Sequence, residues 1–267
     1  MGEIIAVVNQ KGGVGKTTTA MNLAACLAAA EHHSLVVDLD PQGNATSGLG
    51  ITGDEGRDSY AVILGECPWK EALAASEVPN LSVIPATKSL AGANVELVSE
   101  IARELKLKDA LAGVRDEFEF VFLDCPPSLE LLTINAMAAA DSLLVPLQCE
   151  YFALEGLGHL LETQKLVRKS VNKTLNLEGI VLTMYDTRNR LSSEIESEVR
   201  QHFPQAVYRT VIPRNVRLSE APSHGKPIIA YDITCRGAEA YMGLASEFLD
   251  RRGLSGGHRK AGAGGRP

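Results

Sequence analysis

The stretch that decides the fold is Lys11-Gly12-Gly13-Val14-Gly15-Lys16-Thr17-Thr18, which lies between the apolar run Ile4–Val8 and the Ala-rich segment Thr17–Ala30. A glycine-rich loop between a strand and a helix lets backbone N–H groups surround phosphate oxygens, and the helix N-terminus adds the positive end of its dipole. Lys16 is then expected to bridge the β and γ phosphates of ATP, while the Thr17 hydroxyl contacts Mg²⁺. The residues expected to bind the nucleotide are Lys11, Gly12, Gly13, Val14, Gly15, Lys16, Thr17 and Thr18.

This loop departs from the general phosphate-loop pattern in two ways. Gln10 stands five positions before Gly15, where glycine is usual, and Lys11 adds a second lysine. The alternative is a glycine-rich turn that only joins a strand to a helix. Because strand, glycine loop, lysine, threonines and helix coincide, nucleotide binding is the favoured interpretation.

Short apolar runs rich in β-branched residues alternate with helix-like stretches along the chain. The expected strands are Ile4–Val8, Leu35–Val37, Leu81–Ile84, Phe120–Leu123, Leu143–Val145 and Gly179–Thr183. The expected helices are Thr17–Ala30, Val95–Leu105, Leu129–Ala139, Ala153–Val167, Leu191–His202 and Gly237–Leu249. This alternation predicts an α/β fold, a single domain with a mainly parallel twisted sheet and helices on both faces.

Acidic side chains follow two of the expected strands, where a parallel sheet holds its ligands. Asp124 ends the run Phe120–Leu123, and we expect it to reach the metal through water. Asp38 and Asp40 follow Leu35–Val37 with the spacing of a strand's side chains, so we expect both to face the phosphates. A carboxylate there could orient the attacking water and accept its proton. The alternative for each aspartate is a turn residue that caps backbone N–H groups.

The overall composition is that of one ordinary globular domain in a reducing compartment. Hydrophobic residues make up 45% of the 267 residues and charged residues 22%. We expect one domain over 1–252 and a disordered, Gly-rich, weakly basic tail over 253–267. The five scattered cysteines, without a CxxC pair, favour reduced thiols over disulfides or a metal cage. We find no signal peptide or membrane-spanning run, so we expect a cytoplasmic protein with no membrane contact.

The charge distribution restricts how this chain could contact a polyanion. Its formal net charge of −7 argues mildly against nucleic acid unless a local basic patch exists. Arg209, Arg214, Arg217 and Lys226 cluster against little local acid. On charge patterning alone, this cluster is either a phosphate-binding strip or a solvated face.

Together these motifs resemble those of the ParA/Soj partition ATPases, a deviant Walker A branch of the MinD/ParA superfamily. The resemblance rests on the lysine loop and on the blocks Val37–Asn44, Asp124–Ser128, Glu150–Gly156, Thr183–Asp186 and Val211–Pro222. It covers residues 3 to about 250, and the later blocks are the more specific to the Soj-like branch.

The resemblance implies an ATP-dependent homodimer in which two chains face each other with the nucleotides between them. Lys11 would cross to the partner's phosphates, and Gly12 would stay small to permit that approach. Lys16 and Asp40 would act in catalysis with Lys11, and Asp38 would lie nearer the metal. Hydrolysis would then depend on assembly, because Lys11 stabilises phosphoryl charge only in the dimer.

The resemblance also implies nonspecific binding of the dimer to double-stranded DNA, and so a place on the nucleoid. The family's DNA-binding arginines match Arg188 and a member of the Arg214 and Arg217 pair. A ParB/Spo0J-like protein would stimulate slow hydrolysis, and the cycle would segregate a chromosome or plasmid. Met184 and Pro213 are expected near the adenine, although a core role would explain either residue equally well.

Three other classes of protein share the lysine loop. A MinD-like membrane-associated regulator ends in an amphipathic helix, but the tail after Arg252 lacks a hydrophobic face. Iron–sulfur carriers need paired cysteines, and no suitable pair is present. A ParA-like ATPase that positions a protein cargo on the nucleoid stays open, because the cargo is chosen by the partner protein. Identifying what co-purifies with an Asp40→Ala form held in its ATP state would separate these possibilities.

Overall fold

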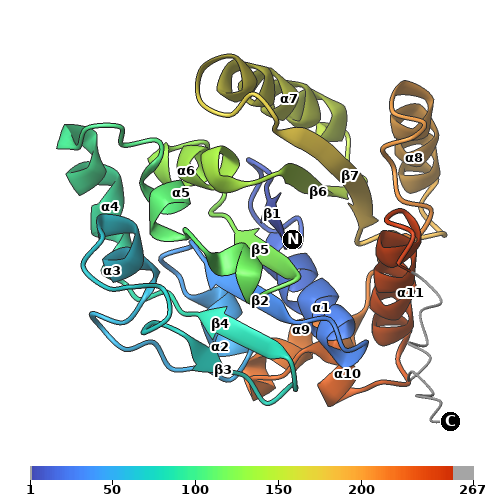
Figure 1. Cartoon of the computed structure of the whole chain (residues 1–267). Helices are drawn as coiled ribbons and strands as arrows, with labels where there is room; N and C mark the ends of the chain where they lie inside the picture. The colour runs from blue at the N-terminus through green and yellow to red at the C-terminus, as the bar shows by residue number, and fades with distance from the viewer. Residues whose placement is uncertain (1, 255–267) are drawn as a thin grey trace, which may run out of the picture.

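The computed structural model describes residues 2–254, and its centre is a seven-stranded sheet with helices on both faces (Figure 1). The strands are β1 Glu3–Val7, β2 Ser34–Asp38, β3 Ala74–Ala75, β4 Leu81–Ile84, β5 Phe120–Asp124, β6 Ser142–Gln148 and β7 Asn176–Thr183. Their order across the sheet is β3-β4-β2-β5-β1-β6-β7. All pairs are parallel except β3 with β4, which confirms the predicted fold class.

The helices lie between the strands in sequence, as a parallel sheet requires. The longer ones are α1 Lys16–Ala29, α4 Leu90–Glu96, α6 Leu131–Ala139, α7 Ala153–Ser170, α8 Arg190–His202 and α11 Arg236–Asp250. The shorter ones are α2 Asn44–Gly48, α3 Ser59–Leu64, α5 Lys106–Ala110, α9 Val216–Glu220 and α10 Ile228–Tyr231. Three single turns complete the set: η1 Leu97–Ser99, η2 Val114–Asp116 and η3 Ala221–His224.

Alternate residues of each strand point to opposite faces, so the sheet separates two hydrophobic cores. In β1, Ile4 and Ala6 belong to the core beneath α3 to α8, whereas Ile5 and Val7 belong to the core beneath α1 and α11. All but one of the β1 residues are buried, and β2 and β5 are buried throughout. The apolar character of these strands on both faces is therefore explained by a helix layer on each side.

The register of the central strands brings the candidate site together. Val7, at the end of β1, pairs with Asp124 of β5, and Asp38 of β2 pairs with the same Asp124 from the other side. The carboxyl ends of these three strands therefore meet at one edge of the sheet. The segments that follow them converge there, which is the usual ligand position in such a fold.

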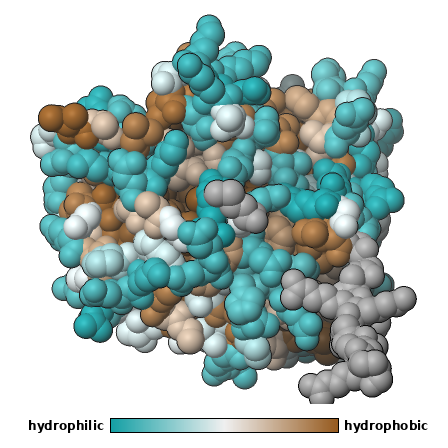
Figure 2. Space-filling model, viewed as in Figure 1, coloured by the Kyte–Doolittle hydropathy of each residue, from teal (hydrophilic) through white to brown (hydrophobic). Residues whose placement is uncertain are grey.

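The predicted helix Val95–Leu105 is wrong. Helix α4 ends at Glu96, η1 follows, and Ala102 has a positive φ of 53° that no helix allows. The residues that reach the core, Leu90, Ala93 and Leu97, lie one turn earlier than expected. After them Val98 and Ile101 face solvent, so no packing supports a longer helix. Figure 2 shows this hydrophobic surface at the upper left.

Several short elements were not predicted, because each is too short to show a clear period: β3, α2, α3, α5, α9 and α10. The predicted tail over 253–267 lies outside the described residues, apart from Gly253 and Leu254. Across residues 2–254, the helices are all too short or too polar to cross a membrane.

Candidate functional site

The glycine-rich loop folds over the side chain of Lys16. Its ammonium group donates a hydrogen bond to the Lys11 carbonyl oxygen at 3.0 Å. Gly13 and Gly15 have φ values of 74° and 89°, which side-chain-bearing residues rarely adopt. Gly15 is also the N-cap of α1, so the free N–H groups of the first helical turn lie at the end of the loop. This geometry can accept phosphate oxygens.

Two side chains fix the loop to the sheet, Asn9 just before the loop and Thr183 from far along the chain. The Thr183 hydroxyl at the end of β7 donates to the Val14 carbonyl at 2.8 Å. The Asn9 side chain accepts from the Lys11 N–H at 3.0 Å and donates to the Pro146 carbonyl of β6 at 2.8 Å. Val14 itself is buried. The loop is therefore held rigidly before any ligand arrives.

A cavity of about 410 Å³ opens above the loop. Its walls include most of the residues expected at the nucleotide, namely Gly12, Gly13, Gly15, Lys16, Thr17, Thr18, Asp40 and Met184. They also include residues that sequence analysis did not single out: Met21, Gln42, Asn44, Ser47, Pro127 and Pro222. Three of them, Gln42, Asn44 and Pro127, lie in the motifs that contain Asp40 and Asp124. Their closeness in sequence to these aspartates is the feature that could have identified them.

The two aspartates after β2 have different surroundings, although both were expected to face the phosphates. Asp40 lines the cavity, and its carboxylate accepts from the Gln42 N–H at 3.0 Å. Asp38 is fully buried and does not line the cavity. Its carboxylate accepts three hydrogen bonds, from the Thr46 N–H at 2.9 Å, the Thr46 hydroxyl at 2.8 Å and the Asp40 N–H at 3.1 Å. Asp38 thus fixes α2 and the turn that carries Asp40.

Asp124 is a buried carboxylate whose two oxygens have no hydrogen-bond partner within residues 2–254. Burial raises its pKa well above the usual range, and the neighbouring Asp38 adds to the rise, while Thr17 and Lys16 oppose it. An unpaired buried carboxylate is costly unless a cation or a donor completes it. Asp124 therefore fits a site that is completed by a positive ion.

The donor set suits Mg²⁺ held jointly with phosphates. No group of three His, Cys, Asp or Glu side chains in the described part of the chain could enclose a metal by itself. Mg²⁺ commonly takes one or two protein carboxylates together with waters and substrate phosphates. The Asp124 carboxylate and the Thr17 hydroxyl are oxygen groups beside the loop that could hold Mg²⁺ in this way.

Lys16 is the cation nearest these carboxylates. Burial lowers the pKa of its ammonium group, and Asp124, Cys125 and Asp40 act against that shift. Burial disfavours the charged ammonium group, whereas the acidic groups at or just after the ends of β5 and β2 favour it. Lys16 is thereby enclosed with acidic neighbours on one side and the loop on the other.

Lys11 lies outside the cavity wall and forms an ion pair with Glu150, just before α7. Their side chains remain 50% and 44% exposed. Gly12, beside Lys11, has room around it, because a Cβ atom there would meet only the Pro127 Cβ, at 3.9 Å. Glu150 belongs to the motif Glu150–Gly156, and its contact with Lys11 is visible only in the structure.

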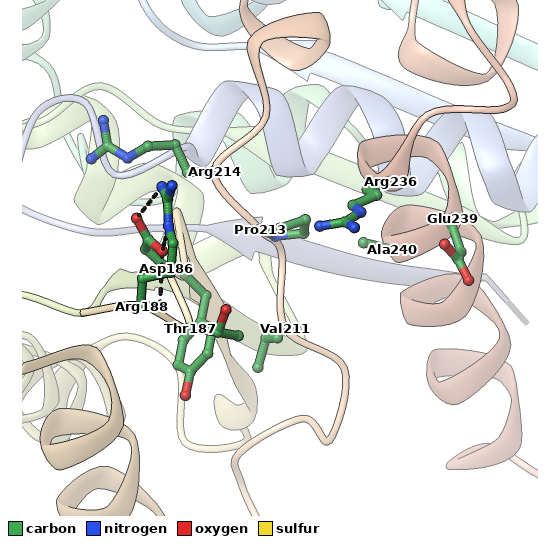
Figure 3. A pocket seen from close by; sticks show the side chains of 10 residues that line it. Asp186, Thr187, Arg188, Val211, Pro213, Arg214, Arg236, Glu239 and Ala240 are labelled. Atoms are coloured by element: carbon green, nitrogen blue, oxygen red, sulfur yellow. Dashed lines mark hydrogen bonds and ion pairs between the residues drawn. The ribbon is translucent and has the colours of Figure 1, made fainter. Parts of the chain in front are cut away.

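A second cavity, of about 690 Å³, contains the other group of predicted residues (Figure 3). It is lined by Arg188, Arg214 and Pro213. Pro213, which was expected near the adenine, therefore lines a different cavity from the phosphate loop. Pro213 nevertheless pairs with Tyr185, the neighbour of Met184. Arg217 does not line this cavity.

Comparison with known protein families matches residues 2–177 to the family described as an AAA domain. The sporulation initiation inhibitor protein Soj of Bacillus subtilis is 56% identical over 248 residues, which span 92% of this chain and 98% of the relative. The chromosome partitioning protein ParA of Myxococcus xanthus is 53% identical over 252 residues, spanning 94% of this chain and 89% of the relative.

Solved structures agree on the architecture. The cobyrinic acid a,c-diamide synthase of Mycobacterium smegmatis, with bound ADP and magnesium, superimposes with a TM-score of 0.81 at 35% identity. The match covers 94% of this chain and 96% of that protein. A nucleotide and magnesium therefore occupy a relative with the same fold.

Proposed function

This chain belongs to the Soj/ParA family of chromosome-partitioning ATPases, and we propose that it works as an ATP-dependent dimer on DNA. In this proposal two chains enclose two ATP molecules, and the dimer binds duplex DNA without sequence preference. A ParB/Spo0J-like partner stimulates hydrolysis and so drives the segregation of a chromosome or plasmid. The protein would therefore act on the nucleoid.

The phosphate loop binds ATP, and the nearby oxygen ligands hold Mg²⁺. Lys16 and the N–H groups at the start of α1 contact the phosphates, and Thr17 and Asp124 face the metal. When bound, Mg²⁺ supplies positive charge to the β and γ phosphate oxygens. The oxygens of Asp124, which have no hydrogen-bond partner within residues 2–254, support this assignment because a bound cation would complete them. Asp38 already accepts three hydrogen bonds, so it supports the site indirectly by holding α2 and the turn that carries Asp40.

Asp40 positions the attacking water and accepts its proton late in the reaction. It is the carboxylate on the cavity wall, and the Gln42 N–H orients it. Proton transfer requires a base within hydrogen-bonding reach of the water, and Asp40 is the aspartate exposed to the cavity. The general base is therefore assigned to Asp40 rather than to Asp38.

Lys11 supplies the charge that makes hydrolysis depend on dimerisation. In the single chain it is paired with Glu150 at the surface, where such an ion pair contributes at most about 1 kcal/mol. Phosphates of a facing chain would replace that carboxylate at little cost. A lysine that arrives across an interface then stabilises phosphoryl charge in the transition state.

DNA binding uses the arginines of the C-terminal third, Arg188, Arg214 and Arg217. All three are exposed, in a protein whose total charge is −7. One small patch neutralises few phosphates, whereas two patches on one rigid dimer act at high effective concentration. ATP thus turns DNA binding on through assembly.

One observation carries this proposal. Gly12, which has free space around it, and the exposed Lys11 lie next to each other at the rim of the phosphate-loop cavity. The test is ATP turnover of the purified chain, alone, with duplex DNA, and with DNA plus the cognate ParB-like protein. We expect slow turnover alone and a clear rise with both additions. Turnover that stays unchanged with the cognate partner and DNA would contradict the proposal.

A further inference from the structure

The arginine-lined cavity contains a third arginine, Arg236, from a distant part of the chain. Arg188 follows β7, Arg214 follows the bridge at Pro213, and Arg236 is the first residue of α11. All three side chains line the same cavity of about 690 Å³. Figure 3 shows the Arg236 guanidinium directed toward Pro213, next to the segment that carries Arg214.

Two of these three arginines form no ion pair in the described chain, although Arg214 lies close enough to Asp186 to help lower its pKa. The side chains of Arg214 and Arg236 form no hydrogen bond or ion pair within residues 2–254. Arg188 differs, because its Nε and a terminal nitrogen donate to Asp186 at 3.0 and 2.9 Å. Arg188 lowers the pKa of Asp186 to about 2, so this pair stays ionised and neutral overall.

The second acid of the cavity, Glu239, has a separate function. It lies in the first turn of α11, where a carboxylate stabilises the helix dipole. In Figure 3 its carboxylate lies beyond Ala240, at the end of the cavity farthest from Arg214. With three arginines and two carboxylates the cavity carries a net charge of +1, and its unpaired cations lie on the side of Arg214 and Pro213.

Asp186 orders Arg188 without using up its donors. A guanidinium group has five N–H donors, and the two hydrogen bonds to Asp186 leave three of them free. Arg217 is in a different position, since it lies between Glu220 at 2.8 Å and Asp232 at 3.5 Å. Any phosphate at Arg217 must compete with two carboxylates, whereas Arg236 forms no ion pair with a carboxylate within residues 2–254.

We infer that Arg236 is a further DNA-binding residue and that a backbone phosphate of duplex DNA occupies the cavity between Arg236, Arg214 and Arg188. Guanidinium groups bind phosphates through paired N–H donors and carry no base information in such contacts. This inference rests on the proposed function, because it requires the ATP dimer to bind DNA. It extends the DNA-binding surface from the loop after β7 to the start of α11.

The test compares Arg236→Ala with the wild-type chain, using ATP-loaded protein and a labelled duplex of mixed sequence. Binding is followed by fluorescence anisotropy over a series of salt concentrations. Arg190→Ala is the matched control, because Arg190 is 92% exposed, lies near Arg188 and does not line the cavity. Thermal unfolding and sizing with ATP check that the variants fold and dimerise.

Two copies of Arg236 are lost per dimer, so the slope of log affinity against log salt should fall by roughly 1.8 in magnitude. The loss of affinity over a fourfold rise in salt would then be about twelvefold smaller than for wild type. Arg190→Ala should keep the wild-type slope. Arg236→Lys should recover much of the slope, since a lysine still neutralises a phosphate.

The outcomes separate this inference from the proposed function. If wild type binds DNA with ATP and Arg236→Ala binds with the same slope, the inference is wrong and the proposed function stands. If wild type dimerises with ATP but does not bind DNA, both are wrong. If Arg236→Ala keeps DNA binding but loses stimulation by the partner protein, the cavity is a protein-docking site and the inference is overturned.

Discussion

Asp38 and Asp124 occupy paired positions on the neighbouring strands β2 and β5, and both carboxyl groups are completely buried. Burial is the main cause of the raised pKa of each carboxyl group. The charge of Asp38 adds to the rise for Asp124, and the charge of Asp40 adds to the rise for Asp38. Asp38 is stabilised by three hydrogen bonds, and Asp124 has none within residues 2–254. Because the oxygens of Asp124 lack hydrogen-bond donors while those of the adjacent Asp38 have them, a cation is expected at Asp124.

The first prediction concerns pH. Burial raises the pKa of Asp38 from 3.8 to about 6, so the folded state binds its proton more tightly than the unfolded state does. The free energy of unfolding should therefore fall as pH rises through this window, by about 2 kcal/mol between about pH 4.5 and about pH 7 from Asp38 alone. Urea unfolding without nucleotide and with EDTA, for wild type and Asp38→Asn, measures this contribution. Equal pH dependence in the two proteins would show that Asp38 does not titrate as described.

The second prediction is that Lys16→Ala abolishes ATP binding. The variant removes the buried cation inside the phosphate loop and leaves Asp40 and Asp124 facing the phosphates unopposed. Isothermal titration calorimetry with ATP and Mg²⁺ gives the affinity, and circular dichroism verifies the fold. Wild-type affinity in this variant would refute the site assignment.

The third prediction is that Asp40→Ala binds ATP and dimerises but hydrolyses ATP more slowly, by roughly 10²–10⁴-fold. Asp40 lines the cavity without forming the loop, so its loss should spare binding. Phosphate release in single-turnover experiments measures the chemical step directly. Should turnover match wild type, the role would move to Asp38.

The fourth prediction is that Gly12→Val gives a nucleotide-bound monomer. Gly12 has neither a positive φ nor a close neighbour, so the single chain tolerates a side chain there. A side chain at this position would instead block the approach of the facing chain and keep Lys11 from crossing. Sizing by light scattering with ATP tests it, and an intact dimer would mean that Gly12 does not face the partner.

Gly13→Val serves as the contrasting variant. Gly13 has a φ of 74°, so a side chain there strains the loop itself. We expect Gly13→Val to lose ATP affinity, whereas Gly12→Val keeps it. The pair separates a defect of assembly from a defect of the loop.

The fifth prediction is that Arg217→Glu weakens binding to all DNA sequences alike and flattens the salt dependence, while dimerisation with ATP persists. The substitution adds a third acid beside Glu220 and Asp232. Affinity for several unrelated duplexes, with ATP and with ADP, provides the measurement. If Arg217→Glu binds normally and Arg188→Ala or Arg214→Ala does not, the patch stands and Arg217 is the wrong choice within it.

The sequence by itself determined the fold class and the phosphate loop, because both depend on local patterns. Apolar runs such as Ile4–Val8 and the glycine positions Gly13 and Gly15 constrain the backbone wherever they occur. The helix expected at Val95–Leu105 failed because its apolar residues could face either core or solvent, and only packing decides that. Local sequence patterns are therefore reliable for strands whose two faces are both covered by helices.

Only the tertiary structure decided how the individual side chains divide the work. Asp38 and Asp40 are the same residue type, two positions apart, and the sequence does not distinguish them. In the structure Thr46 donates two hydrogen bonds to Asp38, whereas Asp40 lines the cavity. The three arginines likewise look alike in the sequence until Asp186, Glu220 and Asp232 are placed beside them. Arg236 lines the same cavity as Arg188 and Arg214 because α11 begins beside the segment that carries Pro213. Electrostatic interactions depend on distances in space, and those distances are set by the packing of segments that the sequence keeps far apart.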